Sequence, residues 1–270
     1  MNITPLGKHI GAEVTDLDLG ATVSADDTKR LNQAITDHLV LVIRDQALSP
    51  QQYRDGLRVF GEPMLQHRAQ FNLEDCPEVS QVVSRGGFPP AVRWHTDHTN
   101  HPLPPKFTAL YGREIPATGG DTAFANMYAA LERLPESEQR ELMTRFTLNS
   151  MEDNPSYSAS DRDTYPGSVR HPMVRLHPES GRSALYFHVS KSQGIEGMDE
   201  GDVRPYLESL LERTIDDTIV YRHRWQAGDI VICDNRCTMH RVYADYAPED
   251  YRLLWRLLIR GEKPRGVNIN

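Results

Sequence analysis

The chain has 270 residues, of which 39% are hydrophobic and 25% are charged, and its formal net charge is −8. This composition is typical of a folded globular protein with one large or two small domains, not of a disordered chain. The acidic balance argues against a nucleic-acid partner held by a broad basic surface, and no apolar run is long enough to span a membrane.

The N-terminus and the cysteines indicate the compartment. Residues 1–7 lack the basic and apolar regions of a signal peptide. The chain has three cysteines, Cys76, Cys233 and Cys237, and an odd, sparse set is typical of a reducing cytosol without a disulfide framework. The sequence therefore predicts a cytoplasmic protein.

Helix signals and apolar runs alternate along the first half of the chain. Ser24 is a suitable N-cap with Asp27 three residues later. Ser49 followed by Pro50 opens a second helix, which Gly61 ends. The predicted elements are helices over 24–38 and 49–61 and strands over 39–43, 79–83 and 107–113.

The second half contains a long polar segment between predicted elements. Residues 153–167 are rich in Ser, Asp and Pro, and long loops in compact domains are often active-site lids. The other predicted elements are two helices within 126–146, a helix over 202–213, and strands over 184–188, 219–225, 229–233 and 252–260. Many strands with helices early and mid-chain predict one mainly β domain over 1–270, a β-sandwich or jelly roll with flanking helices.

One short motif indicates a metal site. His95 and Asp97 point to the same side if their segment is extended, so an imidazole and a carboxylate could hold a divalent metal from two corners. With 11 histidines in the chain, the pair alone could equally be two unrelated polar residues. His240 follows an apolar strand and a polar turn and is a candidate third ligand, although a lone His there would more often be structural. Together the three residues would form the 2-His-1-carboxylate arrangement of non-haem Fe(II) oxygenases.

The last predicted strand carries arginines on one face. Alternation places Arg252, Arg256 and Arg260 together, and arginine in an otherwise apolar strand needs a partner. That partner could be solvent or an internal carboxylate, or it could be the carboxylate of a ligand, which a guanidinium binds bidentately. Upstream, residues 119–122 (Gly-Gly-Asp-Thr) are by themselves only a tight turn, but the Thr122 hydroxyl could complete a carboxylate site.

In this order, the motifs resemble those of the TauD/TfdA family of Fe(II)- and 2-oxoglutarate-dependent dioxygenases. The resemblance covers nearly the whole chain and is specific as a combination. The segments that carry it are 3–7, 10–14, 43–46, 94–97, 119–122, 171–175, 177–182, 234–240 and 261–264.

The resemblance implies a double-stranded β-helix (jelly roll) core and an oxygenase mechanism. By position, the family's iron ligands correspond to His95, Asp97 and His240. Thr122 and Arg256 match the residues that hold the distal carboxylate of 2-oxoglutarate, and Arg252 matches a second arginine near the other carboxylate. Decarboxylation of 2-oxoglutarate with O2, giving succinate and CO2, would then drive oxidation of a substrate C–H bond, most often hydroxylation. Because Asp97 is retained, halogenation is not expected.

The substrate is predicted less closely than the reaction. Taurine-oxidising members have an Asn four residues before the first iron ligand, where this chain has Ala91, and two apolar positions after the ligand pair are His98 and Asn100 here. His67 lies near the region where a family His contacts the anionic head of the substrate. We expect His67, His98 and Asn100 to recognise a small polar substrate with a carboxylate or sulfonate, although His98 and Asn100 could instead only orient the ligand loop.

Two alternatives remain open at this point. The same iron chemistry could desaturate, cyclise or decarboxylate a natural-product intermediate, an outcome that the ligands do not distinguish. A non-catalytic jelly-roll protein could bind a metal or a keto acid as a sensor, but buried ligands and arginines cost stability when they have no use. The family resemblance also implies a homo-oligomer, a dimer or a tetramer.

Overall fold

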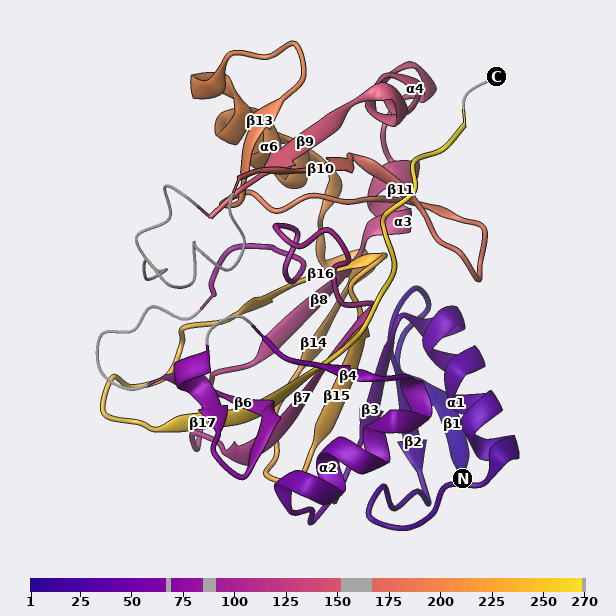
Figure 1. Ribbon diagram of the computed structural model, residues 1–270, viewed down its shortest axis with the longest axis vertical. Helices are drawn as coiled ribbons and strands as arrows, with labels where there is room; N and C mark the ends of the chain where they lie inside the picture. Colours follow the sequence, from indigo (N-terminus) through magenta and orange to yellow (C-terminus); the bar gives the residue numbers. More distant parts are fainter. Residues whose placement is uncertain (67–68, 85–90, 152–166, 269–270) are drawn as a thin grey trace.

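The computed structural model describes residues 1–66, 69–84, 91–151 and 167–268 (Figure 1). It is a mixed α/β, strand-rich fold built on one large sheet in the order β1-β2-β3-β15-β7-β17-β6-β5, with β4 also paired to β17. The bounds of these strands are β1 Asn2–Pro5, β2 Ala12–Thr15, β3 Val40–Ile43, β4 Pro63–Met64, β5 Asn72–Leu73, β6 Cys76–Ser84, β7 Phe107–Glu114, β15 Ile230–Asp234 and β17 Arg252–Ile259.

Smaller sheets complete the described strands. A three-stranded sheet in the order β14-β8-β16 lies beside the large sheet (Figure 1). Two others have the orders β10-β9-β13 and β11-β12. Their strands are β8 Thr122–Asn126, β9 Phe146–Asn149, β10 Val169–Pro172, β11 Val174–Leu176, β12 Ser183–Leu185, β13 Ser192–Ile195, β14 Val220–His223 and β16 Thr238–Val242.

The helices begin where the sequence places their caps. The Ser24 hydroxyl accepts a hydrogen bond from the Asp27 amide at 3.0 Å, and Ser49 forms a reciprocal capping box with Gln52. The second helix is shorter than predicted, because its last turn over Leu57–Phe60 tightens into a 3-10 helix before Gly61. The helices are α1 Ala25–His38, α2 Pro50–Gly56, α3 Met127–Glu132, α4 Glu136–Thr144 and α6 Glu200–Thr214.

The large sheet is buried on both faces. In β3, Val40 and Val42 belong to the core that the large sheet shares with β8 and β16, whereas Leu41 and Ile43 belong to the core beneath α1 and α2. Successive side chains of a strand point to opposite faces, so a continuous apolar run is what a doubly covered strand requires. The inner face, toward β8 and β16, is the one that carries the candidate site.

The structure confirms most predicted elements and corrects several boundaries. The predicted strand over 184–188 ends at Leu185, and β6 and β7 extend beyond their predicted bounds. The short strands β8 and β16, both of which carry site residues, were not predicted. The possible lid over 153–167 lies outside the described residues except for Gly167. None of the helices in the described part of the chain combines the length and hydrophobicity that a membrane span requires.

Candidate metal and keto-acid site

Backbone pairing brings the two candidate histidine ligands together. His95 and His240 form an antiparallel bridge, in which the amide of each donates to the carbonyl of the other at 3.1 and 2.7 Å. Asp97 opens a turn directly afterwards, and His98 takes a left-handed conformation with φ of 53°. The potential ligand atoms of His95, Asp97 and His240 all lie within 4.8 Å of one another. The structure therefore brings the three residues together, with only the first part of the His95 segment extended.

Both imidazoles are held in the neutral form that binds metals. Nδ1 of His95 lies 2.8 Å from the carbonyl oxygen of Arg93, so Nδ1 carries the proton and Nε2 keeps its lone pair. Burial lowers the pKa of His95, and burial together with the neighbouring His95 lowers the pKa of His240 to about 3. Neither ring requires deprotonation before it coordinates an ion.

The carboxylate between them is ionised and held at one oxygen. Burial is the largest single influence and opposes its charge, but the Arg256 guanidinium together with the neighbouring His240, His98 and His95 holds the pKa of Asp97 well below its usual range. The Thr108 hydroxyl donates to Oδ2 of Asp97 at 2.7 Å, whereas Oδ1 lies 3.9 Å from NH1 of Arg256. An anion is thus available beside the two neutral imidazoles.

The donor set fits a first-row divalent metal. Two imidazoles and one carboxylate are the ligands of the facial arrangement that leaves coordination positions open. Nδ1 of His240 is buried and has no hydrogen-bond partner among the described residues, and a buried polar atom without a partner is rare unless an unseen group satisfies it. The residues present are therefore compatible with a resident metal ion.

A buried guanidinium lies in the same pocket without a carboxylate partner. Arg252 is 1% exposed, and its Nε donates to the Gly120 carbonyl at 3.0 Å while NH2 donates to Oγ1 of Thr122 at 3.2 Å. No Asp or Glu of the described segments forms an ion pair with Arg252. Burial lowers its pKa to about 10. A buried cation that meets only neutral oxygens is a binding position for an anion.

Thr122 is prepared to donate a hydrogen bond. Its oxygen accepts from Nε1 of Trp225 at 3.0 Å as well as from Arg252, so both lone pairs are used and the hydroxyl proton remains for a ligand. The preceding Gly120 has φ of 72°, and a Cβ there would lie 3.2 Å from Cδ of Arg252. Glycine therefore lets the turn approach the arginine closely.

The structure changes the pairing that the resemblance implied. Thr122 accepts a hydrogen bond from Arg252, not from Arg256. Arg256 lies four residues further along β17, where it donates to Gln66 and faces Asp97. Arg260 lies beyond the end of β17 and is exposed. Both Arg252 and Arg256 line a cavity of about 90 Å³ that also contains the metal cluster. Its lining comprises Val82, Val83, Ser84, Ala91, His95, Asp97, Leu110, Thr122, His240, Val242, Arg252, Leu254 and Arg256.

The candidate substrate residues have different outcomes. His98 and Asn100 are buried, at 5% and 3% exposure, on the turn that follows Asp97. Both side-chain atoms of the Asn100 amide lack a hydrogen-bond partner among the described residues. His67 lies outside the described residues, so its predicted contact remains a prediction.

For three residues of the site, no role was predicted from the sequence. Thr108 lies inside an apolar strand pattern and Trp225 ends the predicted strand over 219–225, and nothing local marks their contacts with Asp97 and Thr122. Asn235 lies within the 234–240 segment of the family resemblance, but no role was assigned to it. Its amide donates to Thr108 at 2.8 Å.

Comparisons with known proteins find related sequences and structures over nearly the whole chain. The family model described as "Taurine catabolism dioxygenase TauD, TfdA family" matches residues 2–258. The alpha-ketoglutarate-dependent 2,4-dichlorophenoxyacetate dioxygenase of Cupriavidus pinatubonensis is 31% identical over 260 residues, covering 88% of this chain and 90% of that protein. The crystal structure of a taurine dioxygenase from Burkholderia xenovorans has a TM-score of 0.83 and 29% identity, covering 98% of this chain and 91% of that one. The structure of AAD-2 in complex with Mn(II) and N-oxalylglycine has a TM-score of 0.83 and 28% identity, covering 97% and 98%.

Proposed function

The chain belongs to the TauD/TfdA family of alpha-ketoglutarate-dependent (2-oxoglutarate-dependent) dioxygenases, and we propose that it uses Fe(II) and O2 to hydroxylate a C–H bond of a small anionic substrate. The observation that carries the proposal is a shared pocket. One cavity contains a His/Asp/His cluster with the protonation states a metal needs and an anion position formed by Arg252 of β17 and Thr122 of β8.

Each part of the pocket has a role in this reaction. His95, Asp97 and His240 would hold the iron. Once bound, iron supplies the redox chemistry that couples decarboxylation of 2-oxoglutarate to substrate oxidation, and the products are succinate and CO2.

Arg252 and Thr122 would bind the distal carboxylate of 2-oxoglutarate. Their guanidinium and hydroxyl converge there, and no carboxylate of the described residues forms an ion pair with Arg252. Leu110, Val242 and Leu254 line the cavity and restrict water around the reacting groups.

The substrate is proposed to be a small polar anion. Two of the relatives are named for 2,4-dichlorophenoxyacetate and taurine, which both carry an acidic group. In this chain, Arg256 is part-buried beside Asp97 and supplies a cation on the metal side of the cavity. The unpartnered amide of Asn100 supports a polar contact from the turn after Asp97, and we propose that His98 and His67 contribute with it.

The core architecture, the location and the oligomeric state are also part of the proposal. The alternation of sheets around the pocket, with β14-β8-β16 beside the large sheet, supports a double-stranded β-helix core in a single domain over 1–270. All three cysteines are free and buried, which supports a cytoplasmic location. A homo-oligomer, dimer or tetramer, is proposed from the family resemblance alone.

An anaerobic titration tests the central proposal. Adding Fe(II) and 2-oxoglutarate is expected to produce a weak visible absorption band that neither gives alone. Under O2, a panel of small carboxylates, amino acids and sulfonates should contain a compound that stimulates succinate formation. No band and no succinate would contradict the oxygenase and leave the metal- or keto-acid-binding sensor as the alternative.

Product mass distinguishes the oxidative outcomes. Hydroxylation adds one oxygen to the substrate, whereas desaturation removes two hydrogens. The alternative of desaturation, cyclisation or oxidative decarboxylation would be favoured if the substrate gained no oxygen.

A further inference from the structure

A buried chain of hydrogen bonds lies behind the carboxylate of the metal cluster. Nδ2 of Asn235 donates to Oγ1 of Thr108 at 2.8 Å, and Oγ1 of Thr108 donates to Oδ2 of Asp97 at 2.7 Å. Thr108 is completely buried and Asn235 is 1% exposed. The chain therefore runs where water cannot replace a missing partner.

The donor and acceptor roles along this chain are fixed by chemistry. The amide nitrogen of Asn235 can only donate, so the Thr108 oxygen accepts and commits its single proton to Asp97. The Thr96 hydroxyl lies 3.5 Å from Oδ1 of Asn235 and 2.8 Å from its carbonyl, which places the amide oxygen on the Thr96 side and the amide nitrogen on the Thr108 side. Oδ2 of Asp97 therefore already accepts a hydrogen bond, whereas Oδ1 has the Arg256 guanidinium only at 3.9 Å and is the freer oxygen for another partner.

We propose that Thr108 and Asn235 are positioning residues that make Asp97 bind the metal through Oδ1 alone. This inference rests on the proposed function, because it concerns how the chain presents Asp97 to the ion. A carboxylate held at one oxygen occupies one coordination position and leaves the others for the keto acid and O2.

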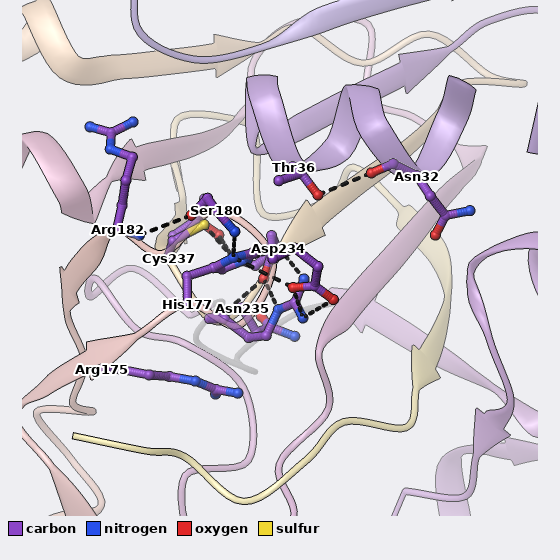
Figure 2. A network of polar contacts seen from close by, with 12 residues as sticks. Asn32, Thr36, Arg175, His177, Ser180, Arg182, Asp234, Asn235 and Cys237 are labelled. Carbon is purple, nitrogen blue, oxygen red and sulfur yellow. Dashed lines mark hydrogen bonds and ion pairs between the residues drawn. The ribbon is translucent and has the colours of Figure 1, made fainter. Parts of the chain in front are cut away.

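The turn that carries Asn235 is itself locked in place. The backbone amide of Asn235 donates to the Lys106 carbonyl at 2.8 Å. The flanking Arg236 donates through Nε and NH2 to the two carboxylate oxygens of Asp234, at 2.9 and 2.7 Å. Asp234 also accepts from His177 at 3.0 Å (Figure 2). The same turn leads into β16 and so to His240. One rigid turn thus places His240 through the backbone and Asp97 through Asn235 and Thr108.

The test is a comparison of metal affinity in matched variants. Binding of Mn(II) is measured by the loss of the free-ion EPR signal in the wild type, Thr108→Val, Thr108→Ser and Thr214→Val. Val keeps the shape of Thr without the hydroxyl, and Ser keeps the hydroxyl. Thr214 is also fully buried, but its hydroxyl donates only to the Leu210 carbonyl within α6, so it controls for hydroxyl loss elsewhere.

The expected result is affinity weakened about 10- to 100-fold in Thr108→Val, restored to within about threefold in Thr108→Ser, and unchanged in Thr214→Val. Folding is checked by circular dichroism. If Thr108→Val does not fold, Asn235→Asp replaces it, since a carboxylate there would draw the Thr108 proton away from Asp97 and should also weaken Mn(II) binding.

Three outcomes would overturn the inference. The first is wild-type Mn(II) affinity in a folded Thr108→Val protein, or in Asn235→Asp where that variant replaces it. The second is an equal loss of affinity in Thr108→Val and Thr108→Ser. The third is a loss of affinity in Thr214→Val equal to that in Thr108→Val. A wild type that binds no Mn(II) would overturn the proposed function itself, and the inference with it, so the two failures are distinguishable.

Discussion

Two clusters of potential metal-binding side chains lie in the described part of the chain, and they differ in how far the protein already uses their ligand atoms. His95, Asp97 and His240 form one cluster, and His177, Asp234 and Cys237 form the other; in both, the ligand atoms lie within 4.8 Å of one another. In the second cluster, Asp234 accepts bonds from Arg236 and from Nε2 of His177, and the Ser180 amide donates to Nδ1 of His177 (Figure 2). The ring nitrogens of His177 and the carboxylate of Asp234 are therefore already engaged in hydrogen bonds within the protein.

The difference shows that proximity of ligand residues does not define a metal site. Burial raises the pKa of Cys237 well above its usual range, so the thiol stays protonated and is a poor ligand. In the first, open cluster, by contrast, Nδ1 of His240 has no described partner and Oδ1 of Asp97 has the Arg256 guanidinium only at 3.9 Å. We therefore expect the closed cluster to contribute stability and the open one to contribute chemistry.

The largest expected effect comes from exchanging one histidine in each cluster for alanine. His240→Ala removes a proposed iron ligand and should reduce 2-oxoglutarate turnover to background, roughly a thousandfold or more, with little loss of thermal stability. His177→Ala should retain metal affinity within a few-fold in the folded fraction but lower the melting temperature. Mn(II) binding and calorimetry on both variants measure the two effects. Equal metal affinity in wild type and His240→Ala would reverse the assignment of the clusters.

Removing the acid of the closed cluster should strongly destabilise the fold. Asp234→Ala leaves the fully buried guanidinium of Arg236 with two partly exposed partners, Glu179 and the more distant Glu262. Breaking one side of a buried ion pair costs about 3–5 kcal/mol. Chemical denaturation measures the free energy of unfolding, and a matched Glu179→Ala variant should lose much less because Glu179 is half exposed. Similar small losses in both variants would show that the network does not hold the turn.

A buried histidine outside both clusters sharpens the contrast, because its ring is paired with a backbone carbonyl and not with a carboxylate. His171 is 1% exposed, its Nε2 lies 3.0 Å from the His101 carbonyl, and burial lowers its pKa to about 4. The unfolded chain takes up this proton below about pH 6.5 and the folded chain only near pH 4, so stability falls as the pH falls between these values. Since a tenfold change in proton affinity is about 1.4 kcal/mol, the loss is about 3 kcal/mol.

Comparison with His171→Gln, which keeps a donor for the His101 carbonyl, isolates this contribution. The variant should lose about 3 kcal/mol less than the wild type when unfolding of the metal-free protein is measured at pH 7 and pH 4. Parallel losses in the two proteins would mean that His171 is not held neutral.

The sequence predicted what depends on local pattern and missed what depends on strand register. Ser24 and Ser49 mark helix starts wherever the helix packs, and the run over β3 is apolar because both faces are covered. The metal cluster was also predictable, because its residues lie in recognisable motifs. The Thr122 partner was not, since it depends on pairing of β8 with β14 and on a bulge in β17 near Leu253 that no local pattern encodes. Family position suggested Arg256 as the partner of Thr122, whereas in the structure Arg252 donates the hydrogen bond to Thr122.

The smallest expected effect tests this corrected pairing directly. Arg252→Lys keeps the positive charge but removes the planar pair of donors, so the KM for 2-oxoglutarate should rise about 10- to 100-fold while metal affinity is retained. Arg256→Lys is the matched control on the same strand, and it should change the KM for 2-oxoglutarate only a few-fold because Arg256 faces Asp97 and Gln66. Initial rates of succinate formation at varied 2-oxoglutarate give both values. A large rise in Arg256→Lys with none in Arg252→Lys would restore the pairing with Thr122 that family position implies, because the far carboxylate can be bound by only one of these arginines together with that hydroxyl.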